Sequence, residues 1–211
     1  MSKWDCNKLL EEFLQEIKKK GSKNCEYMLS LENLPHMEPT LRQIHLETYL
    51  VTLLGFPNIS LIMQGILLEA LLKEIIFEKE RTDFHGSYGS ALEHSNMKGY
   101  LDKKDYRFLD EFRDKIRNRY QHIDVKELTE GSYAYVYKVK IDKDDPAGSI
   151  LKGTLEVLSG KSKPPIKMTP EQMRPLGQIM KLQIDENIYV EQFLYVDYFV
   201  RKMCRKYFPV E

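Results

Sequence analysis

Apolar residues recur at helical spacing along most of the chain, so the sequence predicts a mainly α-helical protein. Positions three and four residues apart fall on one face of an α-helix. On this basis we predict helices over residues of about 4–20, 40–54, 58–79, 90–98, 105–122, 169–182 and 190–207. Gly21, Gly55 and Gly99 are expected to end the first, second and fourth helices, because glycine readily adopts the left-handed conformation that follows many helices.

The predicted helix over residues 58–79 is apolar nearly all round, which is typical of a helix at the centre of a bundle or in an interface. It overlaps an uncharged run, Thr48–Leu68, whose length would also suit a membrane span. Gly55 and Pro57 interrupt that run, and Pro57 removes a backbone donor and disfavours helix at Phe56. We therefore predict two core helices with a break between them and no membrane span.

One region shows strand periodicity instead. Residues 132–141 alternate, with Tyr133, Tyr135 and Tyr137 on one side, and a turn signal containing proline and glycine follows at 142–148. Ile150–Leu158 is a second strand-like run. We predict a β-hairpin at about 132–159, within an insertion of about residues 130–168. Its tyrosines could stack on RNA bases, although packing against the bundle is the commoner use of such a row.

Together these elements predict one all-α domain over residues 1–211, an up-and-down helical bundle with the hairpin inserted. Residues of about 4–125 and 169–208 form its helical core. Charged residues make up 30% of the chain and balance to a net charge of zero, so no global basic field attracts nucleic acid. Residues 102–119 hold seven Lys or Arg against five Asp or Glu, a small local excess that a solvated helix face also shows.

The cysteines and histidines indicate neither disulfides nor metal. Cys6, Cys25 and Cys204 are an odd number for a disulfide framework, and no pair has metal-ligand spacing. A reducing cytoplasm is the simplest interpretation, and the N-terminus begins a charged helix rather than a signal peptide. His85 and His94 are not joined by a ligand spacing such as H-x-x-x-H, so we predict no metal and no cofactor.

The end of the predicted helix over residues 105–122 contains a group of polar and charged residues that a helix would not need for packing alone. There Arg117, Asn118 and His122 form R-N-x-x-x-H, with the further cations Arg113 and Arg119 close by. RNA carries its own nucleophile, the 2′-hydroxyl, and a histidine that titrates near neutrality can remove or return its proton. A guanidinium can neutralise the charge that grows on the phosphate, and an asparagine can orient either group or bind the ribose or phosphate.

Arg117-Asn118-x-x-x-His122, with the run Leu109–Asn118 leading into it, resembles the signature of the HEPN superfamily. These are small helical bundles that include many metal-independent ribonucleases of toxin–antitoxin and antiphage systems. The resemblance covers residues of about 40–125 and the last helix. It implies an endoribonuclease with Arg117, Asn118 and His122 as catalytic residues, no cofactor, RNA as substrate and, in a toxin, an antitoxin protein as partner.

Arg117 and His122 do not share a helix face, because five residues of an ideal helix amount to about 140° of rotation. Asn118 and His122, four apart, do share one. Either the long arginine swings round, or two copies of the helix end meet across a two-fold axis. The resemblance favours the second arrangement. We therefore expect a homodimer with both copies of Arg117 and His122 in one cleft.

HEPN proteins often carry a polar or acidic residue on the helix before the motif, which here leaves Glu69, Lys73 and Glu74 as alternatives. Glu69 and Lys73 are four apart and suit an ion pair, which on most helices faces solvent. The sharper hypothesis is that Glu69 reaches across the bundle to Arg117. The candidate supporting or RNA-binding residues are Glu69, Lys73, Arg113 and Arg119.

Two other functions are compatible with the sequence. One is a non-catalytic HEPN module that binds RNA or a protein partner, and the other is a plain helical interaction protein with a coincidental motif. In the last case Arg117 should pair with an acid rather than face a cleft. The chain also departs from HEPN toxins that carry a modified tyrosine two residues after the histidine, because Asp124 stands there. That mode of control is therefore not expected.

Overall fold

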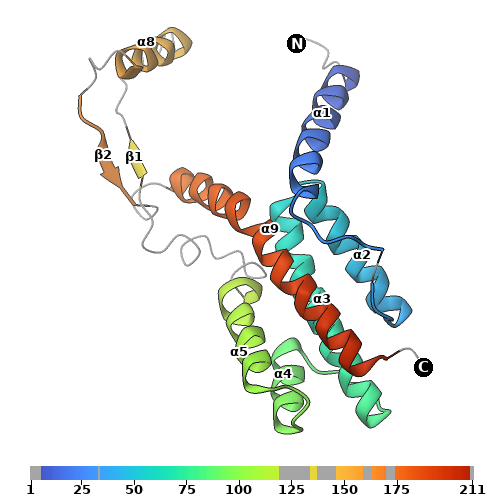
Figure 1. Ribbon diagram of the computed structural model, residues 1–211. Coiled ribbons are helices and arrows are strands. Elements are labelled where there is room, and N and C mark those ends of the chain that lie inside the picture. Colours follow the sequence, from blue (N-terminus) through green and yellow to red (C-terminus); the bar gives the residue numbers. More distant parts are fainter. Residues whose placement is uncertain are drawn as a thin grey trace. The chain divides into compact units, whose positions relative to one another are not determined.

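The computed structural model describes residues 6–32, 34–118, 134–136, 146–158, 163–169 and 174–209. Helices dominate these segments, as the sequence predicts (Figure 1). They are α1 (Cys6–Cys25), α2 (Pro39–Leu53), α3 (Pro57–Glu80), α4 (Tyr88–Met97), α5 (Lys103–Phe112), α8 (Pro146–Leu158) and α9 (Arg174–Tyr207). A π-helical turn, η1 (Arg113–Arg117), continues α5, and the strands are β1 (Ala134–Val136) and β2 (Ile166–Met168).

The chain divides into two compact units. The first joins residues 1–123 to residues 184–211, and the second comprises residues 124–183. The first unit holds α1 to α5, η1 and most of α9, so it is built from both ends of the chain. The second unit holds β1, α8, β2 and the beginning of α9.

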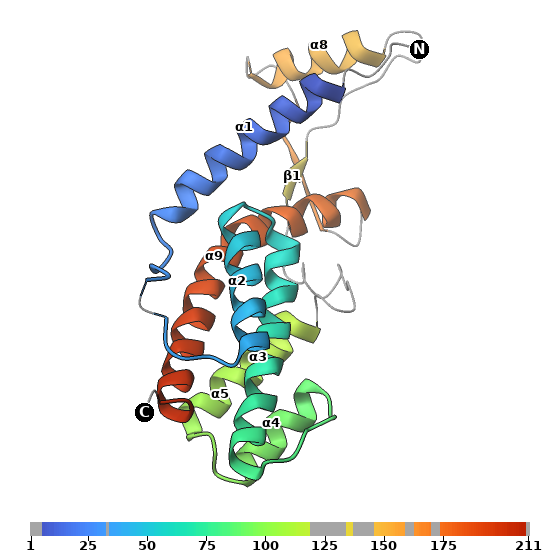
Figure 2. The ribbon, with the colours of Figure 1, turned by 90° about the vertical axis from the view of Figure 1, so that its right-hand side faces the viewer.

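Helix α3 is the core of the first unit, which is one of the two positions, bundle centre or interface, that its apolar character left open. Figures 1 and 2 both show α2, α3 and the C-terminal part of α9 running beside one another. Five leucines of α3 are completely buried, and each fully buried leucine stabilises the fold by about 1.5–3 kcal/mol. They are Leu61, Leu67, Leu68, Leu71 and Leu72. None of the described helices is both long enough and apolar enough to cross a membrane.

Two of the three predicted helix stops are confirmed. Gly55 and Gly99 adopt positive φ angles of 80° and 72° just beyond α2 and α4, where residues with a β-carbon are strained. The predicted stop at Gly21 is wrong, because α1 continues to Cys25. Tertiary contacts hold the extra turn: the amide of Asn24 donates to the Thr52 carbonyl at 3.0 Å and to the Tyr189 hydroxyl at 2.8 Å.

The predicted β-hairpin at 132–159 is wrong in its second strand. Ile150–Leu158 lies within α8, and β1 pairs instead with β2, antiparallel, with Tyr135 opposite Lys167. Leu151, Leu155 and Leu158 are four and three apart, so the same run also satisfies helical periodicity. Pro146, read as part of a turn, is the first residue of α8, a position that favours proline.

The two helices predicted over 169–182 and 190–207 are one continuous helix, α9. The described part of this helix begins at Arg174, and residues 170–173, which bear on the predicted start at Thr169, lie outside the described residues. The stretch between the two predicted helices is anchored in the first unit. Lys20 of α1 donates to Glu186 at 2.6 Å, and the buried Tyr189 accepts from Asn24.

Candidate functional site

The motif arginine ends a π-helical turn. In η1 the backbone N–H of Asn118 donates to the carbonyl of Arg113, five residues earlier. Such turns are rare and occur frequently at functional sites. The turn ends at Arg117, while Arg119, His122 and Asp124 lie outside the described residues.

Arg117 crosses to the central helix α3 and meets Glu69, as the sharper hypothesis from the sequence predicted. Its Nη2 donates to Glu69 Oε2 at 2.8 Å. The second oxygen of Glu69 accepts from Lys73 at 2.9 Å, so the carboxylate bridges two cations. The Arg117 side chain is only 16% exposed and that of Glu69 23%. The sequence left Glu69, Lys73 and Glu74 as alternatives, and the structure brings Glu69 to the arginine with Lys73 behind it.

The two cations keep Glu69 ionised in partly dry surroundings. Burial raises the pKa of Glu69, but the hydrogen bonds from Lys73 and Arg117 lower it, and the net pKa lies below the usual value. Glu74 behaves oppositely. Burial, with the nearby charges of Glu38 and Asp83, raises its pKa. Of the two acids, Glu69 is therefore the one that complements the motif arginine electrostatically.

The Arg117 side chain packs against a glycine of α3 and a buried tyrosine ring. A β-carbon at Gly65 of α3 would lie 3.3 Å from Arg117 Cγ, so the glycine lets the arginine pass close to the helix. The guanidinium carbon stands 5.1 Å from the centroid of the Tyr88 ring, a cation–π distance. Tyr88 is fully buried and donates to the Leu109 carbonyl at 3.0 Å, which fixes the ring. The guanidinium is therefore held from two sides.

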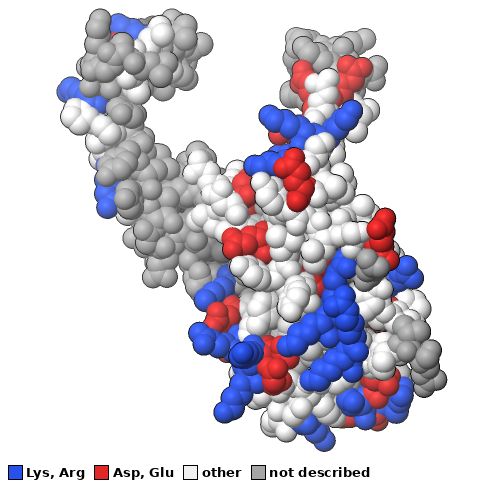
Figure 3. All heavy atoms as spheres, viewed as in Figure 1, with Lys and Arg blue, Asp and Glu red and all other residues white. Residues whose placement is uncertain are grey.

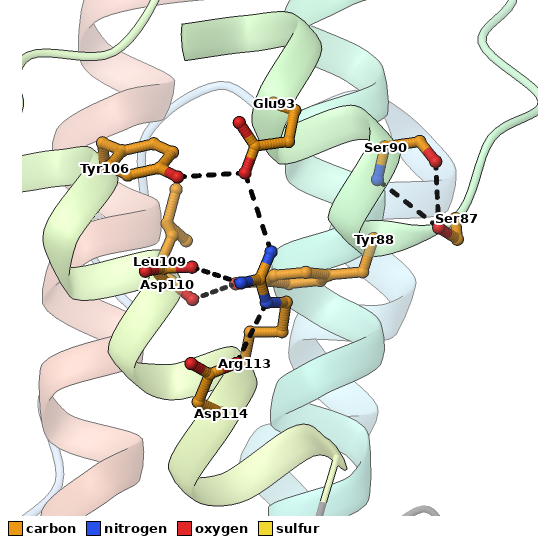
Figure 4. Close-up of polar contacts among 9 residues, drawn as sticks. All are labelled: Ser87, Tyr88, Ser90, Glu93, Tyr106, Leu109, Asp110, Arg113 and Asp114. Carbon is orange, nitrogen blue, oxygen red and sulfur yellow. Dashed lines mark hydrogen bonds and ion pairs between the residues drawn. The ribbon is translucent and has the colours of Figure 1, made fainter.

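Arg113, four residues earlier, turns to other partners, although it was also a candidate for RNA binding. Figure 4 shows its guanidinium among the carboxylates of Glu93, Asp110 and Asp114. Its nitrogens lie 2.6 Å from Asp110, 3.2 Å from Asp114 and 3.8 Å from Glu93. Tyr106 of α5 also donates to Glu93, at 2.9 Å. Arg113 therefore ties α4 to α5, and the acids around it offset its attraction for a phosphate.

An apolar strip of α3 leads up to the Arg117–Glu69 pair. Ile59, Ile62 and Ile66 are exposed large hydrophobic residues, spaced three and four apart on one helix face. Glu69 continues the same line three residues beyond Ile66. Asn118, the second motif residue, is half-buried directly after the π-helical turn. The candidate site thus consists of a clamped arginine at the edge of an exposed apolar surface.

A buried polar cluster between α2 and α9 was missed by the sequence analysis. His45 Nε2 donates to Asp197 Oδ1 at 2.6 Å, and Arg201 Nε donates to the same oxygen at 2.9 Å. Burial raises the pKa of Asp197, but the hydrogen bonds from His45 and Arg201 lower it below its usual value. Asp197 and Arg201, four apart and flanked by apolar residues of the last helix, were the available signal. Their partner His45 lies 152 residues away from Asp197.

Comparisons of the chain with models of known protein families, with curated proteins and with solved structures find no match. Among the described residues, no group of three or more His, Cys, Asp or Glu side chains could hold a metal ion.

Proposed function

We propose that the chain is a metal-independent endoribonuclease of the HEPN type, acting in toxin–antitoxin or antiphage defence. The observation that carries the proposal is the clamped Arg117 of the R-N-x-x-x-H motif. Glu69 and Tyr88 hold it within the first unit, so that the guanidinium meets a substrate without first being ordered. An arginine that only made a helix end soluble would not need to pack closely against a glycine and a buried aromatic ring.

The proposed reaction uses the RNA's own nucleophile. His122 removes the proton of the 2′-hydroxyl, the 2′-oxygen attacks the adjacent phosphorus, and the bond from phosphorus to the 5′-oxygen breaks. The leaving 5′-oxygen takes up a proton from a histidine. Arg117 offsets the negative charge that grows on the phosphate oxygens, and Asn118 orients the histidine or the ribose. The products are a 2′,3′-cyclic phosphate and a free 5′-hydroxyl.

A homodimer supplies the second histidine and arginine. The exposed Ile59, Ile62 and Ile66 beside the clamped arginine offer an apolar surface that a second copy can cover. Across a two-fold axis, such contact brings the two copies of Arg117 close together. The shared site then contains two copies of the motif. In the cytoplasm such a dimer would meet its RNA substrate.

The Arg117–Glu69 pair also favours the two competing functions. An arginine paired with an acid is what the sequence led us to expect of a plain helical interaction protein, and it suits a second candidate as well, a non-catalytic HEPN module. An arginine already paired with an acid is what a structural motif requires, and Glu69 occupies a donor that a phosphate would use. In such a module the motif maintains the fold or the dimer, and RNA or a protein partner binds elsewhere. The two candidates differ in whether His122 is needed for an activity.

The test is cleavage of a mixed RNA pool in EDTA by wild type, His122→Ala and the control His85→Ala. His85 is an exposed histidine outside the motif. Cyclic phosphate ends made by wild type and the control, but not by His122→Ala, are the expected result. Cleavage that persists in His122→Ala contradicts the mechanism. No cleavage by any protein, with expression toxicity that is independent of His122, identifies the binding module instead.

A further inference from the structure

The last helix presents a continuous stripe of aromatic and basic residues to solvent. Tyr195, Tyr198, Lys202 and Arg205 are spaced three and four apart, so they lie along one face of α9, with Lys206 beside them. Tyr195 is 54% exposed and Tyr198 65%. Arg205 and Lys206 are exposed as well. The structure thus turns both tyrosines outward.

This stripe concentrates positive charge in a chain that has none overall. Lys plus Arg and Asp plus Glu each number 32, yet the stripe carries three basic residues, Lys202, Arg205 and Lys206, and residues 198–209 contain no acidic one. The fourth basic residue of that span, Arg201, is buried and not part of the stripe. Figure 3 shows Lys and Arg atoms gathered over the C-terminal part of α9. Lys79 of α3 adds to the group, because its ammonium and that of Lys206 stand 5.1 and 4.8 Å from the same Tyr207 ring. Acids offset two of these cations, because Lys202 contacts Asp105 and Asp102 and the buried Arg201 pairs with Asp197.

Helix stability explains part of this arrangement but not all of it. Cations in the last turn of a helix are favoured by its dipole, which accounts for Arg205 and Lys206. It does not account for two exposed tyrosines two to three turns earlier. More than half of each tyrosine is exposed, and the only described hydrogen bond of their hydroxyls is a long one, 3.4 Å, from Tyr195 to Glu191.

We propose that this face of α9 binds single-stranded RNA, with Tyr195 and Tyr198 stacking on bases and Lys202, Arg205 and Lys206 contacting phosphates. Exposed aromatic rings next to a line of cations are what unpaired strands require, because every base has a face to stack and every linkage a charge. Ten residues of helix separate Tyr195 from Arg205, about 15 Å, which is room for a few nucleotides. An acidic protein would also match the cations, and tyrosines are common in protein interfaces as well. The choice of RNA as the polyanion rests on the proposed function.

The test measures binding of a fluorescent single-stranded RNA by anisotropy across a salt series. Full-length His122→Ala protein serves as the parent, so that cleavage does not interfere. Two paired variants, Tyr195→Ala with Tyr198→Ala and Arg205→Gln with Lys206→Gln, alter the face. Matched controls alter exposed residues of the same kinds elsewhere: Tyr27→Ala, and Lys18→Gln with Lys19→Gln in α1.

The two paired variants should fail in different ways. Removing two phosphate contacts should reduce the slope of log binding constant against log salt by about 1.4, since each contact to a single strand contributes roughly 0.7. Removing the tyrosines should weaken binding at least about fivefold at fixed salt and leave the slope unchanged. The controls should bind within about twofold of the parent.

Three results would overturn the proposal. They are a parent protein that binds no RNA, face variants that bind like the controls, and a poly-glutamate that competes as well as RNA at equal charge, which would indicate an acidic protein partner. Because the parent lacks His122, the outcome is separate from catalysis. A wild-type protein that never cleaves RNA removes the proposed ribonuclease and leaves this binding face standing.

Discussion

Replacing Glu69 with glutamine tests how strongly the candidate site depends on one carboxylate. The change keeps the size of the side chain and one acceptor oxygen, but it removes the charge shared by Arg117 and Lys73. Arg117 then remains mostly enclosed without a counter-ion in contact. We expect the protein to fold, to lose stability and to hold the guanidinium less firmly.

The size of the loss follows from burial. An exposed ion pair contributes about 0–1 kcal/mol, whereas breaking a fully buried pair costs about 3–5 kcal/mol. The side chains of Arg117 and Glu69 are 16% and 23% exposed, which places the pair between these limits. We expect Glu69→Gln to lower the free energy of unfolding by about 2 kcal/mol. With a urea dependence of about 2 kcal/mol per molar, the unfolding midpoint falls by roughly 1 M.

The chain supplies a matched control in Glu111. This carboxylate also bridges two cations, Arg107 at 2.8 Å and Lys115 at 3.1 Å, but the pairs lie in solvent. Glu111→Gln should leave the urea midpoint unchanged. Equal midpoints for the two variants, or a loss below about 0.5 kcal/mol for Glu69→Gln, would show that burial does not strengthen the Arg117 pair and that our reasoning is wrong.

The pH dependence of the same variant has a definite sign. Because the pKa of Glu69 is lowered in the folded protein, its carboxylate stabilises the fold above the pKa of an unfolded glutamate, about 4.3. That contribution is lost as the pH falls below this value. The stability difference between wild type and Glu69→Gln should therefore be full at pH 7 and shrink below about pH 4, as urea unfolding across a pH series will show.

Three further predictions concern the site and the bundle. Asp197→Asn should lower the free energy of unfolding by about 3–5 kcal/mol, because it leaves the buried Arg201 unpaired, and a double variant Asp197→Leu, Arg201→Met should recover much of the loss in urea unfolding. Gly65→Ala should reduce RNA cleavage, because the new β-carbon would lie only 3.3 Å from Arg117 Cγ and push the arginine away. Thermal stability should change little, since alanine gains about 1 kcal/mol of helix propensity that offsets the crowding. Tyr88→Phe should cost about 1 kcal/mol in calorimetry, through loss of its buried hydrogen bond, and keep the ring under Arg117.

The candidate site was predictable in part, because some of its residues form patterns over short stretches of the sequence. The R-N-x-x-x-H spacing and the Glu69–Lys73 pair are both short-range patterns, and the helices that carry them have unbroken apolar faces. That Glu69 meets Arg117, 48 residues away, was a hypothesis among three until packing placed α3 against η1. The π-helical turn had no sequence signal that we recognised. It depends on how Ile116 and Arg117 fit against neighbouring helices, which local spacing does not encode.

The sequence by itself determined the helical class, the apolar character of α3 and the helix stops at Gly55 and Gly99, because periodicity and left-handed glycines act within a few residues. Only the tertiary structure decided the rest. It extended α1 past Gly21 through Asn24, made α8 a helix where two periodicities fitted equally, and placed His45 beside Asp197. Each of these outcomes depends on partners distant in the sequence or on a choice between two local patterns. The energy that decides them arises only when the elements come together.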